Sequence, residues 1–218
     1  MESPASKAYF GYGSNLWQEQ MVLRCPSSPY IGLGRLRGYR WFINARGYAN
    51  IAKTGTETDE VWGLVYDLKP VDEARLDVNE GVPYAYEKRM IPVEFWHAGS
   101  GPPTATTTGD GGDGKSPAPS VDAVPMLVYI DFKRTSENHT PKPEYVHRMN
   151  CGIRDALKEG VPQDYVDKVL RYYIPADEKG SSDQVKGFAL KQALSFEDES
   201  GNIERMESGW VEQKEWAN

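Results

Sequence analysis

Two short segments hold residues whose types and spacing could perform chemistry. The first runs from Tyr9 to Leu16 and reads YFGYGSNL, so that an apolar strand passes into two glycines, a serine and an asparagine. Gly13 is free to adopt backbone angles closed to other residues, and such a turn before a helix can point several N–H groups at one carboxylate or amide oxygen. Taken alone, the segment is explained more simply as a capped turn that binds nothing.

The second segment runs from Leu76 to Lys88 and reads LDVNEGVPYAYEK. We expect Glu80 to lie at the C-terminal end of a helix, where the helix dipole and burial by aromatic neighbours both disfavour the charged carboxylate. Its pKa should therefore rise towards the range that is useful for proton transfer. A solvated glutamate at a helix end is far more frequent, and by itself it explains this segment as well.

The sequence lacks the residue patterns of a dinucleotide-binding site, a serine nucleophile or a metal site. Gly11 and Gly13 are not followed by the third glycine of a dinucleotide-binding fingerprint. The sequence also has no serine-nucleophile motif. His97, His139 and His147 show no spacing with Asp, Glu or Cys that suggests a metal site, so we interpret them as surface or structural histidines. We therefore expect no metal and no other cofactor.

The strands that must position these residues are indicated by apolar stretches rich in β-branched and aromatic residues, bounded by Gly and Pro. They are predicted over Ala8–Tyr12, Tyr30–Asn44 with a break near Gly38, Tyr48–Lys53, Glu60–Leu68, Tyr84–Trp96 and Pro125–Phe132.

Helical spacing appears in four places. The first helix follows Asn15, which we interpret as its N-cap, with Gln18 at the third helical position. The second runs from Pro70 to Asn79 and is stopped by Gly81, which places Glu80 at its C-terminal end. The remaining helices are predicted over Glu144–Glu159 and Pro162–Tyr173.

Many strands with a few segregated helices predict an α+β domain around a small mixed sheet or barrel. We assign residues 7–178 to this domain and residues 179–218 to a C-terminal extension. Residues 99–120 consist mainly of Gly, Pro, Thr, Ser and Asp, which favours a flexible insertion between two strands.

Composition limits the partners and the compartment. The 218 residues are 39% hydrophobic, enough for a substantial core, and the net charge of -7 leaves no broad basic surface for nucleic acid or anionic membranes. The N-terminus lacks the apolar run of a secretory signal, and no stretch is long enough to span a membrane. We therefore expect a cytoplasmic protein that acts on a small molecule, with Cys25 and Cys151 as buried free thiols. A homodimer is compatible with the sequence.

Three blocks in this order and spacing resemble the γ-glutamylcyclotransferase family. They are YGSNL at Tyr12–Leu16, NEGVPYAYEK at Asn79–Lys88, and PEYVHRM followed by GVPQDYVDKVL within Pro143–Leu170. The resemblance spans most of the chain and implies the family's fold, a compact mixed β-barrel flanked by helices.

The resemblance also implies roles for individual residues. Glu80 matches the catalytic acid/base, and Tyr86 and Tyr145 match the tyrosines of the pocket, with Tyr84 as an alternative to Tyr86. The substrate-binding loop corresponds to Tyr12, Gly13, Ser14, Asn15 and Leu16. Since neither Tyr9–Leu16 nor Asn79–Tyr86 contains Lys or Arg, we expect backbone N–H groups to hold the substrate.

The implied reaction is cofactor-independent cleavage of a γ-glutamyl amide, of the lyase or acyltransferase type. The glutamyl α-amine attacks its own γ-carbonyl carbon, which releases 5-oxoproline and a free amine. The substrate would be a γ-glutamyl-amino acid, a γ-glutamyl-amine, or a compound of glutathione metabolism, including a conjugate of a secondary metabolite. A binding module that keeps the pocket without catalysis is the alternative of a different class.

Overall fold

The computed structural model describes residues 5–100, 123–137, 139–177 and 180–196. Within these residues five strands form a closed barrel in the order β1-β5-β2-β6-β7, in which β1 pairs with β7 in parallel and the other pairs are antiparallel. These strands are β1 (Lys7–Gly11), β2 (Tyr30–Arg37), β5 (Glu60–Leu68), β6 (Glu87–His97) and β7 (Ala123–Ile130). Strands β3 (Tyr39–Ile43) and β4 (Ala49–Lys53) form a separate antiparallel hairpin. The predicted α+β barrel is thereby confirmed.

Two glycines allow the barrel to close around an aromatic ring. Gly34 on β2 and Gly63 on β5 are partners in the strand register, and both lie against Phe10 of β1. A Cβ atom at Gly63 would come within 2.6 Å of Cε2 of the Phe10 ring, and one at Gly34 within 2.7 Å of its Cδ2. The missing side chains therefore make the space that the fully buried Phe10 ring fills.

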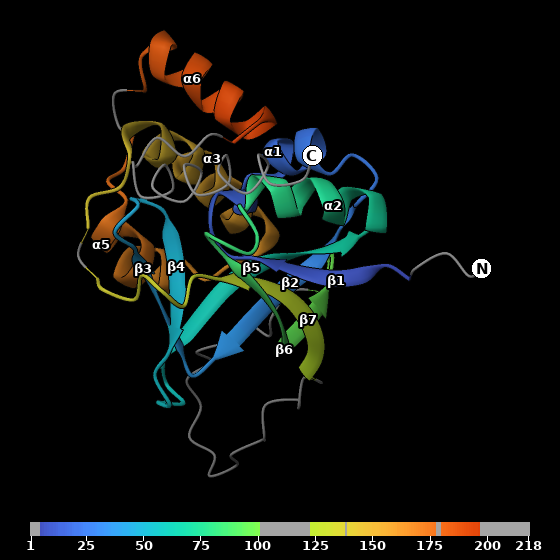
Figure 1. The fold of residues 1–218 in the computed structure, drawn as a ribbon. Helices are drawn as coiled ribbons and strands as arrows, with labels where there is room; N and C mark the ends of the chain where they lie inside the picture. Colours follow the sequence, from blue (N-terminus) through green and yellow to red (C-terminus); the bar gives the residue numbers. More distant parts are fainter. Residues whose placement is uncertain (1–4, 101–122, 138, 178–179, 197–218) are drawn as a thin grey trace, which may run out of the picture.

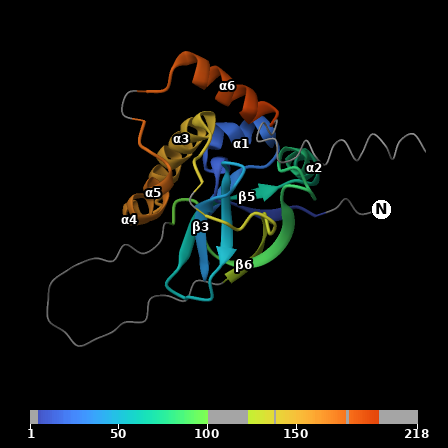
Figure 2. The same ribbon diagram turned by 60° about the vertical axis from the view of Figure 1, so that its left-hand side comes forward.

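The helices gather mainly over one end of the barrel. Figures 1 and 2 show α1, α2 and α3 above the strands, with α6 lying across α1 and α3. The segments are the 3₁₀ turn η1 (Ser14–Leu16), α1 (Gln18–Arg24), α2 (Pro70–Asn79), α3 (Pro143–Glu159), α4 (Gln163–Tyr165), the π-helical turn η2 (Val166–Leu170), α5 (Arg171–Tyr173) and α6 (Asp183–Leu194).

The long helix α3 approaches the turn after β1 very closely. A Cβ atom at Gly152 would lie 2.8 Å from Leu16 Cβ and 2.9 Å from the backbone nitrogen of Trp17, so only a glycine fits between helix and turn. Gly160, at φ 104°, ends the same helix in the left-handed conformation that glycine favours. Helix α3 thereby fixes the YGSNL turn from outside the barrel.

Most predicted elements occur where expected, and the exceptions have local causes. The helix Pro70–Asn79 is confirmed with its bounds, and Glu80 is its C-terminal cap residue. Asn15 does not cap a helix, because it lies inside η1 and its amide is used in the pocket, while α1 begins only at Gln18. The strand predicted from Tyr84 begins at Glu87, since residues 80–86 turn instead.

The single helix predicted over Pro162–Tyr173 is one helical stretch interrupted by the π turn. Most of the proposed insertion, residues 101–120, and residues 197–218 of the proposed extension lie outside the described part of the chain. Cys25 and Cys151 are buried free thiols, as expected.

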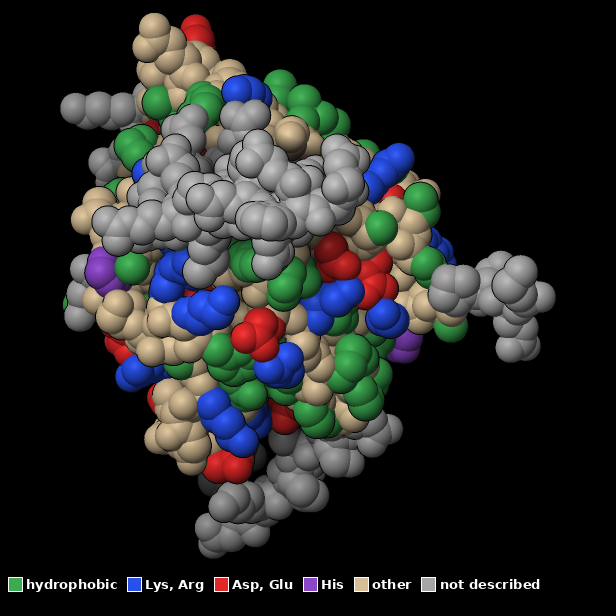
Figure 3. Space-filling view, in the orientation of Figure 1, with side chains coloured by type: hydrophobic (Ala, Val, Ile, Leu, Met, Phe, Trp, Pro, Cys, Tyr) green, Lys and Arg blue, Asp and Glu red, His purple; other side chains and the backbone are tan. Residues whose placement is uncertain are grey.

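The described surface carries mixed charge. Figure 3 shows acidic and basic side chains next to one another on the face seen in Figure 1. Lys88 on β6, for example, forms ion pairs with both Glu73 and Asp77. Among the described side chains that Figure 3 shows on this face, basic ones are therefore interspersed with acidic ones. Among the described residues, no helix has the length and apolar character needed to cross a bilayer.

Candidate active site

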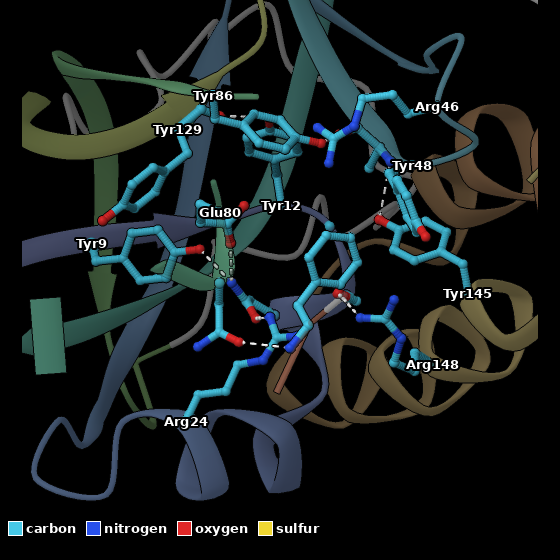
Figure 4. Close-up of a pocket in the computed structure, with 16 residues that line it drawn as sticks. Tyr9, Tyr12, Arg24, Arg46, Tyr48, Glu80, Tyr86, Tyr129, Tyr145 and Arg148 are labelled. Carbon is cyan, nitrogen blue, oxygen red and sulfur yellow. Dashed lines mark hydrogen bonds between the residues drawn. The ribbon is translucent and has the colours of Figure 1, made fainter. Parts of the chain in front are cut away.

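A pocket opens at the end of the barrel that the helices cover. Figure 4 shows the Glu80 carboxylate near the middle of this pocket, with Tyr9 on one side and Arg148 on the other. The space within it measures about 50 Å³, room for several waters and hence for a small polar group. The lining residues are Tyr9, Tyr12, Gly13, Ser14, Asn15, Arg24, Arg46, Tyr48, Ala49, Asn79, Glu80, Tyr86, Tyr129, Tyr145, Arg148 and Phe196.

The Asn15 side chain joins the two predicted segments. Its Nδ2 donates hydrogen bonds to Glu80 Oε1 at 3.1 Å and to the Tyr9 hydroxyl at 2.7 Å. Its Oδ1 accepts hydrogen bonds from Gln20 Nε2 at 2.7 Å and from an Arg24 guanidinium nitrogen at 3.2 Å. Because donors occupy the oxygen of the amide, its NH₂ group must face the carboxylate. The turn after β1 and the end of α2 thus form one site.

Glu80 has the environment of a proton-transfer group. Burial raises the pKa of the Glu80 carboxyl, while the charges of Arg24 and Arg46 and the hydrogen bond from Asn15 oppose this rise. The net direction is upward, from an ordinary glutamate value of 4.5. A carboxylate that is both held by a donor and easier to protonate can accept and return a proton near neutral pH.

This direction predicts the pH dependence of any reaction that uses Glu80 as a base. Below its pKa the carboxyl is protonated and cannot accept a proton, so kcat/KM should fall as the pH drops through that value. Because burial raises the pKa, the acid limb should lie above pH 4.5. Measuring kcat/KM between about pH 4 and pH 8 checks this, and a limb at or below the ordinary glutamate value contradicts it.

The tyrosines form the walls of the pocket. The Tyr12 hydroxyl donates to the Tyr129 carbonyl at 2.6 Å, and the Tyr86 hydroxyl donates to the Ala49 carbonyl at 2.7 Å. Burial raises the pKa of Tyr12 and of Tyr86 well above the ordinary value, and it raises the pKa of Tyr145 to about 12. All three are therefore neutral phenols at physiological pH.

The structure distinguishes the two tyrosines that follow Glu80. Tyr86 is 7% exposed and lines the pocket, whereas Tyr84 is 40% exposed and lies outside it. Tyr145 also lines the pocket, and its hydroxyl accepts a hydrogen bond from the Ala49 N–H at 3.1 Å. Of the predicted binding loop, Leu16 is the exception, because its side chain is buried in the core instead of facing the pocket.

Gly13 is needed for close packing. Its φ of -106° lies outside the left-handed region, so that conformation is not what requires a glycine here. A Cβ atom at this position would lie 3.0 Å from the Tyr145 hydroxyl oxygen and 3.2 Å from Ala49 Cβ. The absent side chain therefore lets the turn approach the tyrosine wall.

We predict that Gly13→Val raises KM about tenfold or more, because the added methyl groups push Tyr145 and Ala49 out of position at an overpacking cost of roughly 1–3 kcal/mol. Gly13→Ala is the matched control and should have a smaller effect. Steady-state kinetics of the two variants test the prediction. Equal KM values for wild type and Gly13→Val would show that the contact is not tight.

Three arginines in the pocket were missed by the sequence analysis. Arg24 comes from α1, Arg46 from the loop between β3 and β4, and Arg148 from α3, and each is at most 4% exposed. Arg148 pairs with Glu144 at 2.8 Å and also donates to Ser14 Oγ at 3.1 Å. The expectation that backbone groups alone hold the substrate is therefore incomplete, since these cations line the same pocket.

One signal could have revealed Arg148. Glu144 and Arg148 are four residues apart, and this spacing places them on one side of the helix, beside the inward-facing Tyr145 and Met149. An ion pair on a buried helix face indicates a polar site. Arg24 and Arg46 have no comparable local pattern.

Comparisons with known proteins agree with this geometry. A sequence model of the family described as "Gamma-glutamyl cyclotransferase, AIG2-like" matches residues 9–107, which include the turn and Glu80. A bovine γ-glutamylcyclotransferase is 27% identical over 193 residues, or 84% of this chain and 87% of the bovine one. Over most of its length the chain is therefore similar to γ-glutamylcyclotransferases.

Other γ-glutamylcyclotransferases show the same similarity. A human γ-glutamylcyclotransferase is 35% identical over 82 residues, which cover 34% of this chain and 44% of the human one. A solved γ-glutamyl cyclotransferase structure superimposes with a TM-score of 0.59 at 24% identity, covering 86% of this chain and 99% of the other. This last comparison shows the shared fold.

Proposed function

We propose that this protein cleaves a γ-glutamyl amide by intramolecular cyclisation, releasing 5-oxoproline and a free amine. The observation that carries the proposal is the Glu80 carboxylate, which faces the pocket with a raised pKa and is held by Asn15. The family relation supplies the reaction class. The substrate class is a small molecule with a γ-glutamyl head.

The reaction needs few catalytic groups from the protein, because the nucleophile and the electrophile belong to one molecule. The α-amine nitrogen forms a bond to the γ-carbonyl carbon, and the bond from that carbon to the leaving nitrogen breaks. Glu80 accepts the proton of the attacking amine and delivers it to the leaving nitrogen, so no water is consumed. Positioning the amine against the carbonyl supplies much of the rate enhancement.

The remaining groups of the pocket suit a glutamyl head. Arg24, Arg46 and Arg148 line the pocket, and their positive charges would attract the α-carboxylate of the substrate. Backbone N–H groups of the turn from Gly13 to Asn15 are the candidates for stabilising the developing oxyanion.

Incubation with γ-glutamyl-alanine tests the proposal. We expect 5-oxoproline and alanine in equal amounts, measured by mass spectrometry. Glutamate and alanine would indicate hydrolysis and contradict cyclisation. Tight binding of the substrate without any product would favour a binding module instead. We further propose that the reaction takes place in the cytoplasm, as the composition suggests.

A further inference from the structure

The last turn of α6 is attached to the pocket through Arg24. The Arg24 side chain is 4% exposed and donates hydrogen bonds to the carbonyl oxygens of Gln192 and Ala193, each at 2.8 Å. Carbonyl groups in the last turn of a helix lack partners within the helix, so a guanidinium is well suited to cap them. The same guanidinium also donates to Asn15 Oδ1. One side chain thus contacts both α6 and the residue that holds Glu80.

Phe196, just beyond α6, contacts Asn79, the residue before Glu80. The backbone N–H of Phe196 donates to Asn79 Oδ1 at 3.1 Å, and Asn79 directly precedes Glu80. The Phe196 ring packs edge-on against Tyr48 with ring centres 5.1 Å apart, and Phe196 lines the pocket. The C-terminal segment is therefore linked both to Asn15, which is hydrogen-bonded to Glu80, and to Asn79, which precedes Glu80 in the sequence.

We propose that docking of residues 183–196 positions Glu80 for catalysis, with Arg24 as the positioning residue that links this segment to Asn15. This inference rests on the proposed function, since it concerns the same carboxylate. Arg24 makes its contacts with the protein, so its role is to orient Asn15 and thereby the carboxylate. Loss of segment docking should then disturb the catalytic geometry as well.

The charges around Glu80 come from every element that packs against it. The cations are Arg24 on α1, Arg46 on the β3–β4 loop and Arg148 on α3. The nearby phenols add no charge, because burial raises the pKa values of Tyr9, Tyr12 and Tyr86 and keeps these groups neutral. Burial, and then the charge of Arg148, lower the pKa of Arg24 to about 10, so it remains a cation at neutral pH. Loss of this cation should therefore raise the pKa of Glu80.

The first test is Arg24→Met, which keeps the volume but removes the charge and the donors. We expect kcat to fall about 10²-fold, the usual effect of a small misplacement of a catalytic group. The acid limb of kcat/KM should move to higher pH. Hydrogen exchange of the α6 amides should speed up, because the helix loses its attachment. Lys186→Met on the exposed side of α6 is the control and should leave all three quantities unchanged.

The second test disrupts α6 without altering any pocket residue. Gly187 lies in the middle of α6, and a Cβ atom there would point into open space within the described structure. A proline at this position breaks the helix. Gly187→Pro should lower kcat as Arg24→Met does. Combining the two should lower kcat no further than the stronger single change, because both act through one contact.

Wild-type kcat in a folded Gly187→Pro protein whose α6 amides exchange rapidly would overturn the inference, as would additive effects in the double variant. The proposed cyclisation could be wrong while the positioning inference holds, in which case the wild type forms no 5-oxoproline. Titration of the Glu80 carboxyl by ¹³C NMR then tests the positioning of Glu80 without any activity measurement. A changed pKa in both single variants supports the inference, and an unchanged pKa in either one contradicts it.

Discussion

Glu80→Gln should lower kcat by roughly 10² to 10⁴ while the protein stays folded, since that is the range for loss of a general acid/base. Glutamine keeps the shape of the side chain and can still bond to Asn15 through its amide oxygen. It can neither accept the proton of the attacking amine nor return it to the leaving nitrogen. The release of 5-oxoproline, measured alongside the melting temperature, checks both parts of this expectation.

Glu87→Gln is a suitable control for this change. Glu87 lies seven residues further on, at the start of β6, and its carboxylate pairs with Arg89 on the surface. Its replacement should leave turnover nearly unchanged, because exposed ion pairs contribute little. Near-normal turnover in a folded Glu80→Gln protein would remove Glu80 from the mechanism, whatever the geometry of the pocket.

Acetylation of the substrate α-amine should abolish the reaction altogether. The acetylated nitrogen is an amide, whose lone pair is delocalised into the acetyl carbonyl and no longer nucleophilic, so the expected loss is complete. We propose a comparison of γ-glutamyl-alanine with its N-acetyl derivative at equal concentration, with free alanine as the common product. This change tests the reaction type and is independent of which side chain moves the proton.

Binding must be separated from reactivity in that comparison. Competition of the N-acetyl compound against γ-glutamyl-alanine shows whether it still enters the pocket. Release of alanine from the acetylated compound would mean ordinary hydrolysis, in which water attacks the γ-carbonyl, and would end the cyclotransferase proposal.

Local signals account for what the sequence predicted well. Pro70 and Gly81 mark the two ends of one helix, and for this reason both its bounds and the position of Glu80 agree with the structure. The strands were predictable because they are apolar and bounded by Gly and Pro, whereas the barrel that they form followed from the family resemblance. Tyr86 and Tyr145 followed from the family resemblance, and both line the pocket.

Long-range contacts account for what the sequence could not predict. Arg24 looks like an ordinary basic residue in the last turn of a short helix, and only the distant carbonyls of Gln192 and Ala193 explain its burial. Asn15 has the composition of a helix cap, but Glu80 and Tyr9 compete for its amide. Such competition depends on the tertiary fold, so propensity alone gives the wrong role.

The presence of Phe196 in the pocket has a consequence for the order in which the protein matures. Tyr9 and Phe196 face the same cavity, although almost the whole length of the chain separates them. During synthesis the chain emerges from its N-terminus at about 5–20 residues per second. The barrel strands have all been made well before Phe196 leaves the ribosome, so a nascent chain can hold a nearly complete barrel around an unfinished pocket. Activity should therefore appear only after Phe196 has been made.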